Sequence, residues 1–314
     1  MLLFTLKASI HLFKQIKKNK EKNSIIYNLG SRVGPFYLIK RRFIKKYNIK
    51  TYLNPDGIEW KRSKWNKLIK LYLKISEKYM VKSSSLIICD SKAIQKYISE
   101  TYPGSKSKYI SYGAELDSKN DINGARKYLE KYNLDSRDFY LVLCRFVPEN
   151  NIELILQGFK QSKTNKKLLL ITNYTKNDFY DYLLKTTEFL NDDRIIFGEP
   201  IYEKKIVATI RNLSSCYIHG HSVGGTNPSL LESLAQTQVN LLFDCEFNKE
   251  VGRDACLYFK KDQNELTEQI NNVDQFDEKT RLEFQEKARQ IIKSNYNWND
   301  VIKAHNNVFE NISE

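Results

Sequence analysis

The stretch that decides the fold is Cys216-Tyr-Ile-His-Gly-His-Ser-Val-Gly-Gly-Thr-Asn-Pro-Ser-Leu-Leu-Glu232. It starts with an apolar run that ends near Ile218, continues through a glycine-rich loop and passes into a helical pattern. Asn227 suits the N-cap of that helix, and Pro228 suits its first position, where the missing N–H costs nothing. A strand, a glycine-rich turn and a helix in this order are typical of a parallel α/β sheet.

This turn is also the first candidate for a binding site. A helix that starts after Asn227 would direct free backbone N–H groups at a ligand, and such a helix N-terminus binds phosphate. Gly224 and Gly225 would let an anion approach the backbone closely. Glu232 lies one turn into the helix, near enough to accept hydrogen bonds from a ribose. A loop that only connects a strand to a helix would have the same composition, so both interpretations stay open.

Strand-like and helix-like runs alternate from one end of the chain to the other, which predicts parallel sheets covered by helices. The predicted strands are Ile25–Tyr27, Thr51–Leu53, Leu86–Cys89, Tyr109–Tyr112, Phe139–Cys144, Leu168–Ile171, Ile195–Phe197, Cys216–His219, Asn240–Phe243 and Leu257–Phe259. The predicted helices include Met1–Phe13, Ser91–Ser99, Ile152–Lys160, Asn177–Phe189, Glu203–Arg211, Ser229–Gln236 and the long segment Glu283–Phe309.

A polar linker divides these elements into two sets. Glu115–Ala125 has the composition of a linker. We therefore predict a Rossmann-like domain over residues 1–116, a second over 117–290, and a C-terminal helix over 291–314 that packs back on the first domain. Only four predicted strands precede the linker, whereas a complete doubly wound domain has about five or six. The first domain is therefore predicted to be incomplete.

Charge is distributed unevenly along the chain. Residues 1–115 hold 25 Lys and Arg against 7 Asp and Glu, so they carry the whole positive excess of a chain whose net charge is +14. The cluster Lys40-Arg41-Arg42, with Lys45 and Lys46 close behind, suits an anionic membrane leaflet. Binding of nucleic acid, binding of an anionic ligand, or a merely solvated lysine-rich face would account for the same charge.

Further features of the composition narrow the class of protein. Five cysteines are scattered without a C-x-x-C pair, which indicates a reduced, cytoplasmic compartment. Four histidines without clustered Cys or carboxylate residues make a structural metal unexpected. No apolar run approaches the roughly 20 residues that a membrane span needs.

Two further stretches follow predicted strands and carry charged residues. In Cys144-Arg-Phe-Val-Pro-Glu-Asn-Asn-Ile-Glu153, Arg145 either clamps a diphosphate or simply faces solvent. In Asn54-Pro-Asp-Gly-Ile-Glu-Trp-Lys-Arg-Ser-Lys-Trp65, Asp56 or Glu59 could orient an acceptor hydroxyl. The bases that could hold an acceptor diphosphate there are Lys61, Arg62 and Lys64. A turn followed by a basic helix is the alternative, because Asn-Pro-Asp-Gly is strong turn chemistry.

The loop and helix before Glu232 and the stretch after Cys144 resemble the donor-site motifs of the large retaining GT-B glycosyltransferase family, which includes sucrose synthase and many bacterial mannosyl- and rhamnosyltransferases. That family has a Glu-x7-Glu pattern in which Glu232 matches the second Glu and Gly224 replaces the first. Arg145 matches the Arg of the family's Gly-Arg-Leu-x-x-Glu-Lys-Gly turn, and Asn150 replaces its Lys. With the Asn54–Trp65 stretch added, the chain more narrowly resembles bacterial rhamnosyltransferases of cell-surface polysaccharide assembly. From this resemblance and typical domain sizes, we expect the chain to lack about seventy N-terminal residues of that subgroup.

The resemblance implies a GT-B architecture and a retaining enzyme that transfers a hexose without a cofactor or metal. The expected donor is dTDP-rhamnose, and the expected acceptor is a lipid-diphosphate-linked saccharide at the inner face of the cell membrane. The donor-binding residues that it implies are Arg145, Asn150, His219, His221, Gly224, Gly225, Thr226, Asn227 and Glu232. The implied catalytic residues are Asp56, Glu59, Arg145 and Glu232, and the implied acceptor-binding residues are Asp56, Lys61, Arg62 and Lys64.

Two other functions stay open. The first is a truncated, non-catalytic or partner-dependent nucleotide-binding protein, suggested by the missing strands, Gly224 and Asn150. The second is a nucleic-acid-binding protein, suggested by the basic pI. No nucleic-acid-binding motif accompanies the positive charge, so we expect no nucleic-acid partner.

Overall fold

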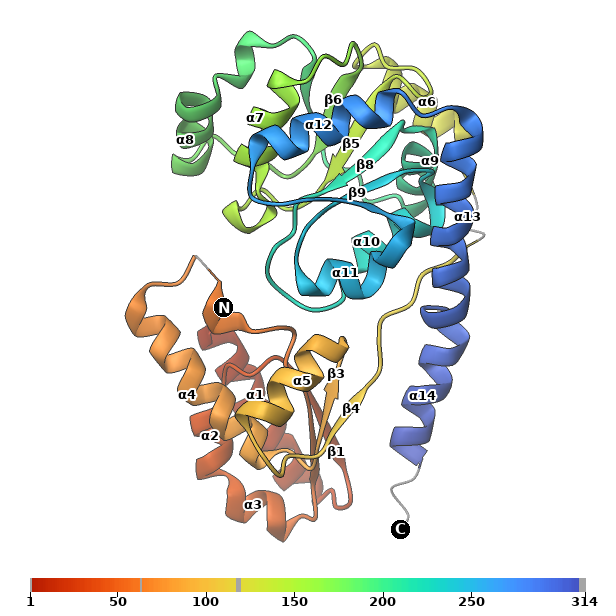
Figure 1. The fold of residues 1–314 in the computed structure, drawn as a ribbon. Helices are drawn as coiled ribbons and strands as arrows, with labels where there is room; N and C mark the ends of the chain where they lie inside the picture. The colour runs from red at the N-terminus through yellow and green to blue at the C-terminus, as the bar shows by residue number, and fades with distance from the viewer. Residues whose placement is uncertain (1, 63, 117–119, 311–314) are drawn as a thin grey trace. The chain divides into compact units, whose positions relative to one another are not determined.

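The computed structural model describes residues 2–62, 64–116 and 120–310. Its contacts divide the chain into two compact units, which Figure 1 shows in the colours of the chain. The first unit is Met1–Ser111 with Val223–Gly225, and the second is Tyr112–Ser222 with Thr226–Glu314. The C-terminal helix therefore groups with the second unit. The predicted domain boundary falls on residues 117–119, which lie outside the described residues.

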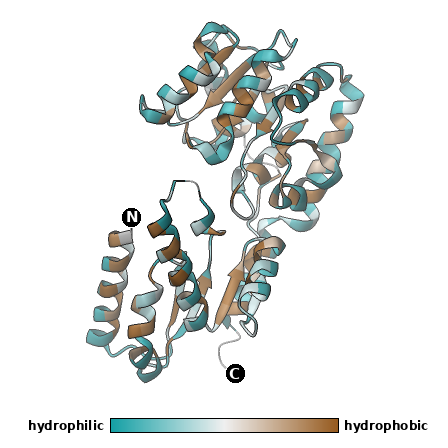
Figure 2. Cartoon of the chain, turned by 60° about the vertical axis from the view of Figure 1, so that its left-hand side comes forward, coloured by the Kyte–Doolittle hydropathy of each residue, from teal (hydrophilic) through white to brown (hydrophobic). Residues whose placement is uncertain are grey.

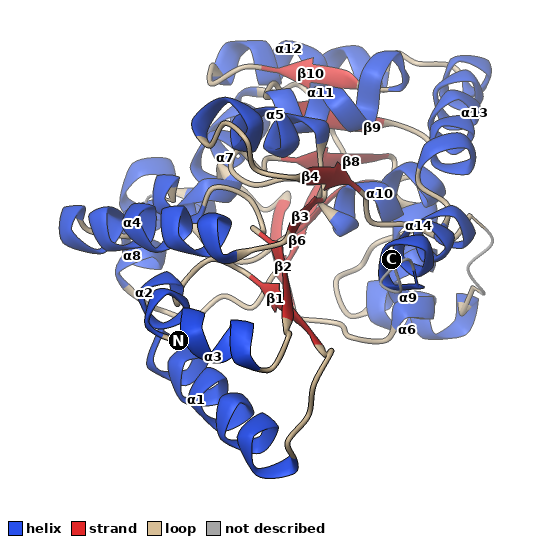
Figure 3. Ribbon diagram, turned by 90° about the horizontal axis from the view of Figure 1, so that it is seen from below, coloured by secondary structure: helices blue, strands red, loops and turns tan. Residues whose placement is uncertain are grey.

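The first unit is built on a parallel sheet whose strands follow one another in the order β1-β2-β3-β4. The strands are β1 (Ile25–Leu29), β2 (Lys50–Asn54), β3 (Leu86–Cys89) and β4 (Ser107–Tyr109). Its helices are α1 (Leu2–Asn19), α2 (Gly34–Ile39), α3 (Arg41–Lys46), η1 (Glu59–Lys61), α4 (Lys67–Ser83) and α5 (Lys92–Thr101). Figure 3 shows α1, α2 and α4 on the same side of this sheet.

The second unit has six parallel strands in the order β10-β9-β8-β5-β6-β7. They are β5 (Phe139–Leu143), β6 (Lys167–Ile171), β7 (Ile195–Gly198), β8 (Cys216–His219), β9 (Asn240–Phe243) and β10 (Leu257–Phe259). Counted from β7 in chain order, this is the order 3-2-1-4-5-6 of dinucleotide-binding Rossmann folds. The direction of winding therefore reverses between β5 and β8, which pair directly with each other.

Helices cover both faces of the second sheet. They are α6 (Ile122–Glu130), η2 (Pro148–Asn150), α7 (Ile152–Gln161), α8 (Asp178–Thr187), η3 (Phe189–Asn191), α9 (Lys204–Leu213), α10 (Pro228–Gln236), α11 (Glu246–Gly252), η4 (Arg253–Ala255), α12 (Gln263–Asp274), α13 (Glu278–Asn295) and α14 (Trp298–Glu310). Among the described residues, no helix has both the length and the apolar character to cross a membrane.

Burial on both faces explains why the strands of the second unit are continuous apolar runs. Along β5, Tyr140 and Val142 join one core cluster, whereas Phe139 and Leu141 join another on the opposite face. All four side chains are at most 1% exposed. Figure 2 shows the same pattern as hydrophobic strands flanked by helices with hydrophilic outer sides.

The predicted α/β class and the ten predicted strands are confirmed, although several predicted strands and helices have different bounds in the structure. The last strand of the first sheet ends at Tyr109, so the predicted strand Tyr109–Tyr112 begins where β4 stops. The predicted helix Asn177–Phe189 ends at Thr187, because Glu188 takes a left-handed conformation with φ 47°. The long C-terminal segment is two helices, α13 and α14, with a break after Asn295.

Gly34 provides a test of packing in the first unit. A Cβ atom at Gly34 would lie 2.0 Å from the backbone oxygen of Ser76, so α2 and α4 meet backbone to backbone at this point. We expect Gly34→Ala to lower the free energy of unfolding by about 1–3 kcal/mol, because the helices must separate. Urea denaturation measures this, with Ser99→Ala on the exposed side of α5 as the control. Equal stability of the two variants would contradict the close approach.

Candidate functional site

The candidate site lies at the carboxyl ends of β5 and β8, where the winding of the second sheet reverses. In open α/β sheets this is where ligands bind. Arg145 follows β5 by two residues, and Gly220 and His221 directly follow β8. Thr172 follows the neighbouring strand β6 in the same way.

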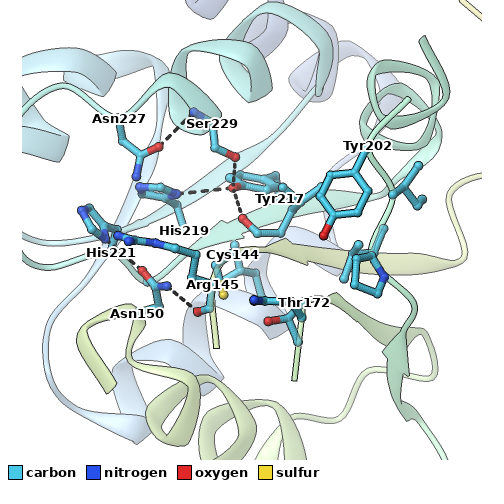
Figure 4. Close-up of a pocket in the computed structure, with 17 residues that line it drawn as sticks. Cys144, Arg145, Asn150, Thr172, Tyr202, Tyr217, His219, His221, Asn227 and Ser229 are labelled. Carbon is cyan, nitrogen blue, oxygen red and sulfur yellow. Dashed lines mark hydrogen bonds between the residues drawn. The ribbon is translucent and has the colours of Figure 1, made fainter. Parts of the chain in front are cut away.

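A cavity of about 380 Å³ opens between these strand ends, and Figure 4 shows the residues around it. Its lining combines one cation with several uncharged polar side chains and an apolar wall. The lining residues are Leu143, Cys144, Arg145, Asn150, Ile171, Thr172, Asn173, Pro200, Ile201, Tyr202, Tyr217, Ile218, His219, Gly220, His221, Asn227 and Ser229. The volume is in the range of small-ligand sites.

The N-terminus of α10 forms one wall of the cavity. Asn227 is the N-cap, and its side-chain oxygen accepts a hydrogen bond of 2.9 Å from the backbone N–H of Ser229. Pro228 occupies the first helical turn. The predicted start of this helix is therefore confirmed. The remaining N–H groups of the first turn give this wall a positive potential.

Hydrogen bonds connect the loop after β5 to the loop after β8. His221 Nδ1 lies 2.9 Å from Asn150 Oδ1, and the Asn150 amide donates to the carbonyl oxygen of Arg145 over 2.6 Å. The amide of Asn151 donates to the carbonyl oxygen of Gly220 over 2.7 Å. A Cβ atom at Gly220 would lie only 2.1 Å from the carbonyl oxygen of Asn150. Glycine at position 220 is thus required for the two loops to meet.

A hydrogen-bonded network lies behind the cavity wall. The Arg211 guanidinium donates to Ser229 Oγ over 3.0 Å, and Ser229 Oγ lies 3.1 Å from the Tyr217 hydroxyl. That hydroxyl donates to the carbonyl oxygen of Leu143 over 3.2 Å and lies 3.4 Å from His219 Nδ1. Figure 4 shows Tyr217 at the centre, between His219 and Ser229. The network joins α9, α10 and the ends of β5 and β8.

His219 at the end of β8 is fully enclosed. Its side chain is buried, and burial together with the nearby His221 and Arg211 lowers the pKa of its imidazole to about 3. The imidazole is therefore neutral throughout the physiological range of pH.

Glu232 lies beside this cavity rather than in it. Its carboxylate accepts from the Arg211 guanidinium over 2.7 Å, with the arginine side chain 3% exposed and the glutamate side chain 47% exposed. Glu232 lines an adjoining cavity of about 480 Å³, which also includes Tyr202, Ser229 and Trp298. The two cavities share Leu143, Ile201, Tyr202 and Ser229 in their linings.

The cavity brings together five of the nine predicted donor-binding residues, namely Arg145, Asn150, His219, His221 and Asn227. Gly224, Gly225 and Thr226 do not line it. The residues of the site and its network that were not predicted from the sequence are Thr172, Tyr202, Tyr217, Ser229 and Arg211. Thr172 could have been found because it follows a predicted strand, as Arg145 does. The sequence did not indicate a role in the site for Arg211 or Tyr217. Arg211 lies in a helix and Tyr217 in a strand, and burial explains the residue pattern of each element.

The predicted acceptor-side stretch in the first unit begins with a tight turn after β2. Asp56 is exposed, has a left-handed conformation with φ 53°, and is followed by Gly57 with φ 78°. The Asn54 side chain accepts a hydrogen bond of 2.9 Å from the Asp56 N–H. The turn chemistry that the sequence indicated is therefore present.

Glu59, which the sequence suggested as a catalytic residue, is enclosed by basic side chains in the structure. Its carboxylate is buried and contacts Arg62 at 2.8 Å, Arg32 at 3.1 Å and Lys64 at 3.5 Å. It also accepts from Trp65 Nε1 over 3.1 Å. Burial alone would raise the pKa of Glu59, but the three cations together outweigh burial and hold that pKa below its usual value. Such a carboxylate is a weak base, and it positions basic side chains instead.

The three predicted acceptor-binding bases thus differ in their surroundings. Arg62 and Lys64 are paired with Glu59, and the Lys64 ammonium also lies 4.7 Å from the centre of the Trp65 ring. The Lys61 ammonium lies over the rings of Trp60 and Tyr97 at 5.7 and 5.9 Å. Aromatic rings hold such cations at a fixed place on the surface.

The Glu59 cluster predicts a pH-dependent contribution to stability. The lowered pKa means that the contribution is present above the unfolded pKa of about 4.3 and is lost as the pH falls through the folded pKa. We expect Glu59→Gln to lower the free energy of unfolding by roughly 2–4 kcal/mol at pH 7. In urea denaturation at decreasing pH, the difference in free energy of unfolding between Glu59→Gln and the wild type should become smaller. The exposed Glu100→Gln on α5 is the control, and a difference that stays constant down to about pH 3 would contradict the assignment.

Comparison with known proteins gives matches to each part of the chain. A family described as "Domain of unknown function (DUF1972)" matches residues 1–115. An uncharacterized glycosyltransferase of Methanocaldococcus jannaschii is 25% identical over 283 residues, which are 88% of this chain and 71% of that protein.

Solved structures match the fold over nearly the whole chain. A glycosyltransferase from Rickettsia africae ESF-5 superposes with a TM-score of 0.76 at 15% identity, over 98% of this chain and 81% of that one. Anabaena HepE in complex with UDP gives a TM-score of 0.75 at 12% identity, over 97% and 81% of the two chains. A trehalose-phosphate synthase from Burkholderia xenovorans gives 0.74 at 12% identity, over 98% and 77%. The chain therefore has the GT-B fold, with parallel sheets in two Rossmann-like domains.

Proposed function

We propose that this protein is a glycosyltransferase that uses a nucleotide-sugar donor. The observation that carries the proposal is the cavity at the reversal point of the second sheet, which has Arg145 on one side and the N-terminus of α10 on the other. The M. jannaschii relative is a glycosyltransferase by its description, and the Anabaena neighbour is described in complexes with UDP and with UDP-glucose.

The diphosphate of the donor would lie between Arg145 and the first turn of α10. Both supply positive potential without a change of protonation, so they would stabilise the charge that develops on the leaving diphosphate. We propose that this is sufficient without a bound metal ion, and retention of transfer activity in EDTA is the expected result. Asp56, the exposed carboxylate in the turn after β2, would orient the acceptor hydroxyl.

The nucleoside would occupy the adjoining cavity that contains Glu232. The carboxylate is held by Arg211, and its exposed side remains accessible to a ribose hydroxyl. Tyr202 and Trp298 supply aromatic surface in that cavity. Within this class, the resemblance of the motifs to rhamnosyltransferases supports dTDP-rhamnose as the donor and a lipid-diphosphate-linked saccharide as the acceptor.

Thermal unfolding against a panel of dTDP, UDP, GDP, ADP and CMP tests the donor site. A ligand that binds only the folded protein raises its melting temperature. We expect a selective rise with one nucleoside diphosphate, and we expect Arg145→Ala to weaken its binding about tenfold or more through loss of a charge-assisted contact. The matched control is Arg126→Ala on α6, which removes an exposed arginine that does not line the cavity.

Each outcome of this experiment separates the alternatives. A higher melting temperature with dTDP supports dTDP-rhamnose as the donor. A higher melting temperature with UDP or GDP supports a glycosyltransferase that uses a different nucleotide-sugar. Binding without release of nucleoside diphosphate from the corresponding nucleotide-sugar, in the presence of lipid-linked acceptor, would indicate the partner-dependent, non-catalytic alternative. A cooperative transition that no nucleotide shifts would refute the donor site.

We also propose that the first unit docks on the anionic inner face of the cell membrane. Leu38 and Ile39 at the end of α2 are 44% and 77% exposed, and Lys40 follows them directly. Arg41 and Arg42 at the start of α3 are exposed as well. Apolar side chains next to a basic cluster suit the interface of a leaflet that contains anionic lipid.

Co-sedimentation with phosphatidylglycerol vesicles tests this surface. Each basic side chain near the membrane contributes about 1 kcal/mol, so reversing two charges by Arg41→Glu with Arg42→Glu should weaken binding at least tenfold, or about 1.4 kcal/mol. The matched control is Lys260→Glu with Lys261→Glu, which reverses two exposed charges in the second unit. Equal binding of both double variants, or equal binding to phosphatidylcholine vesicles, would count against the proposal.

A further inference from the structure

Two buried polar atoms around the first cavity have no hydrogen-bond partner among the described residues. They are Nε2 of His219 and the hydroxyl oxygen of Thr172. Both residues line the cavity, and their exposed fractions are 4% and 3%. A buried polar atom left unpaired costs free energy, which a ligand group can recover.

The network behind the wall favours one of the two neutral tautomers of His219. The Tyr217 hydroxyl has one hydrogen, which it donates to the carbonyl oxygen of Leu143. Ser229 Oγ receives a hydrogen from Arg211, so its own hydrogen is available to the Tyr217 oxygen. The contact between Tyr217 and His219 Nδ1 is then satisfied only if Nδ1 carries the hydrogen and donates it.

This tautomer leaves a lone pair on Nε2 of His219. A neutral imidazole with hydrogen on Nδ1 can only accept at Nε2, and the burial of the ring keeps it neutral. Phosphate oxygens at neutral pH are acceptors too, so they cannot pair with this atom. The partner of Nε2 must donate a hydrogen, and the hydrogen-bond donors that lie next to the diphosphate in a nucleotide-sugar are sugar hydroxyls.

We propose that Nε2 of His219 accepts a hydrogen bond from a hydroxyl of the transferred sugar, and that Arg211, Ser229 and Tyr217 are positioning residues that hold the imidazole in the accepting tautomer. The inference rests on the proposed nucleotide-sugar site and assigns the sugar-recognising residue within it. Gly224, where the resembling family has a Glu, supplies no side chain for that purpose. A ribose hydroxyl is the other source of the same chemistry.

Calorimetric titration of matched ligands distinguishes the two sources. The probes are UDP with UDP-glucose and dTDP with dTDP-rhamnose, titrated into the wild type and into His219→Phe. We expect the variant to bind the nucleoside diphosphate as the wild type does and to bind its sugar conjugate about tenfold more weakly, because one hydroxyl loses its acceptor. An equal loss for both ligands would assign the hydroxyl to the ribose. Unchanged binding of both would refute an accepting role.

Two further variants show whether a loss of affinity in His219→Phe comes from misfolding or from a nonspecific effect of replacing a histidine. His219→Gln places an amide oxygen near the position of Nε2, so it should recover part of the lost affinity for the sugar conjugate. His305→Phe changes a histidine on α14 whose Nδ1 contacts the backbone oxygen of Val301, and it should leave all affinities unchanged. A Gln variant that binds no better than the Phe variant would contradict the proposal.

Nitrogen-15 NMR of labelled histidine tests the tautomer in the wild-type protein without any substitution. The His219 signals should show hydrogen on Nδ1 and none on Nε2, and Nε2 should shift when the sugar conjugate binds. Hydrogen on Nε2 would overturn the inference even if nucleotides bind. Failure of the wild type to bind any probe would instead refute the proposed function, and the inference with it.

Discussion

The direct parallel pairing of β5 with β8 is the constraint from which the site follows. These strands are neighbours in the sheet although some seventy residues separate them, and the winding of the helices reverses between them. Because the crossovers on the two sides run in opposite directions, the loops after the two strands are free to meet. Asn150 accepts a hydrogen bond from His221, and Asn151 donates one to the carbonyl oxygen of Gly220, so the two loops are joined. Gly220 allows the approach because any Cβ atom there would collide with backbone.

The two glutamates in the sequence motifs, Glu59 and Glu232, differ in how far their carboxylates are buried. Glu59 is enclosed by Arg32, Arg62 and Lys64, so its ionised state is fixed and it organises cations in the first unit. Glu232 is half exposed and shares one buried arginine, Arg211, whose other contacts lead into the wall of the cavity. A carboxylate surrounded on all sides supports structure, whereas one with an open side can meet a ligand.

Much of the fold could be predicted from the sequence, because strands buried on both faces are continuous apolar runs and helix starts carry their own signals. The cap at Asn227 and Pro228 is local chemistry, and the structure has it as predicted. The part of the site that follows strands was predictable for the same reason, since Arg145 and His219 lie at strand ends. Tyr217 and Arg211 were not predictable, because a buried tyrosine and a helical arginine have no local pattern that marks a network.

The sequence by itself determined the α/β class, the strands and the residues that stand at their carboxyl ends, because these depend on patterns within a few neighbouring residues. Only the tertiary structure decided which strand ends adjoin, that Glu59 is buried among cations, and that Glu232 lines a second cavity beside Trp298. Those features depend on contacts between residues that are distant in the chain. These features result from burial and from the geometry of hydrogen bonds, and the spacing of residue types along the sequence predicts neither.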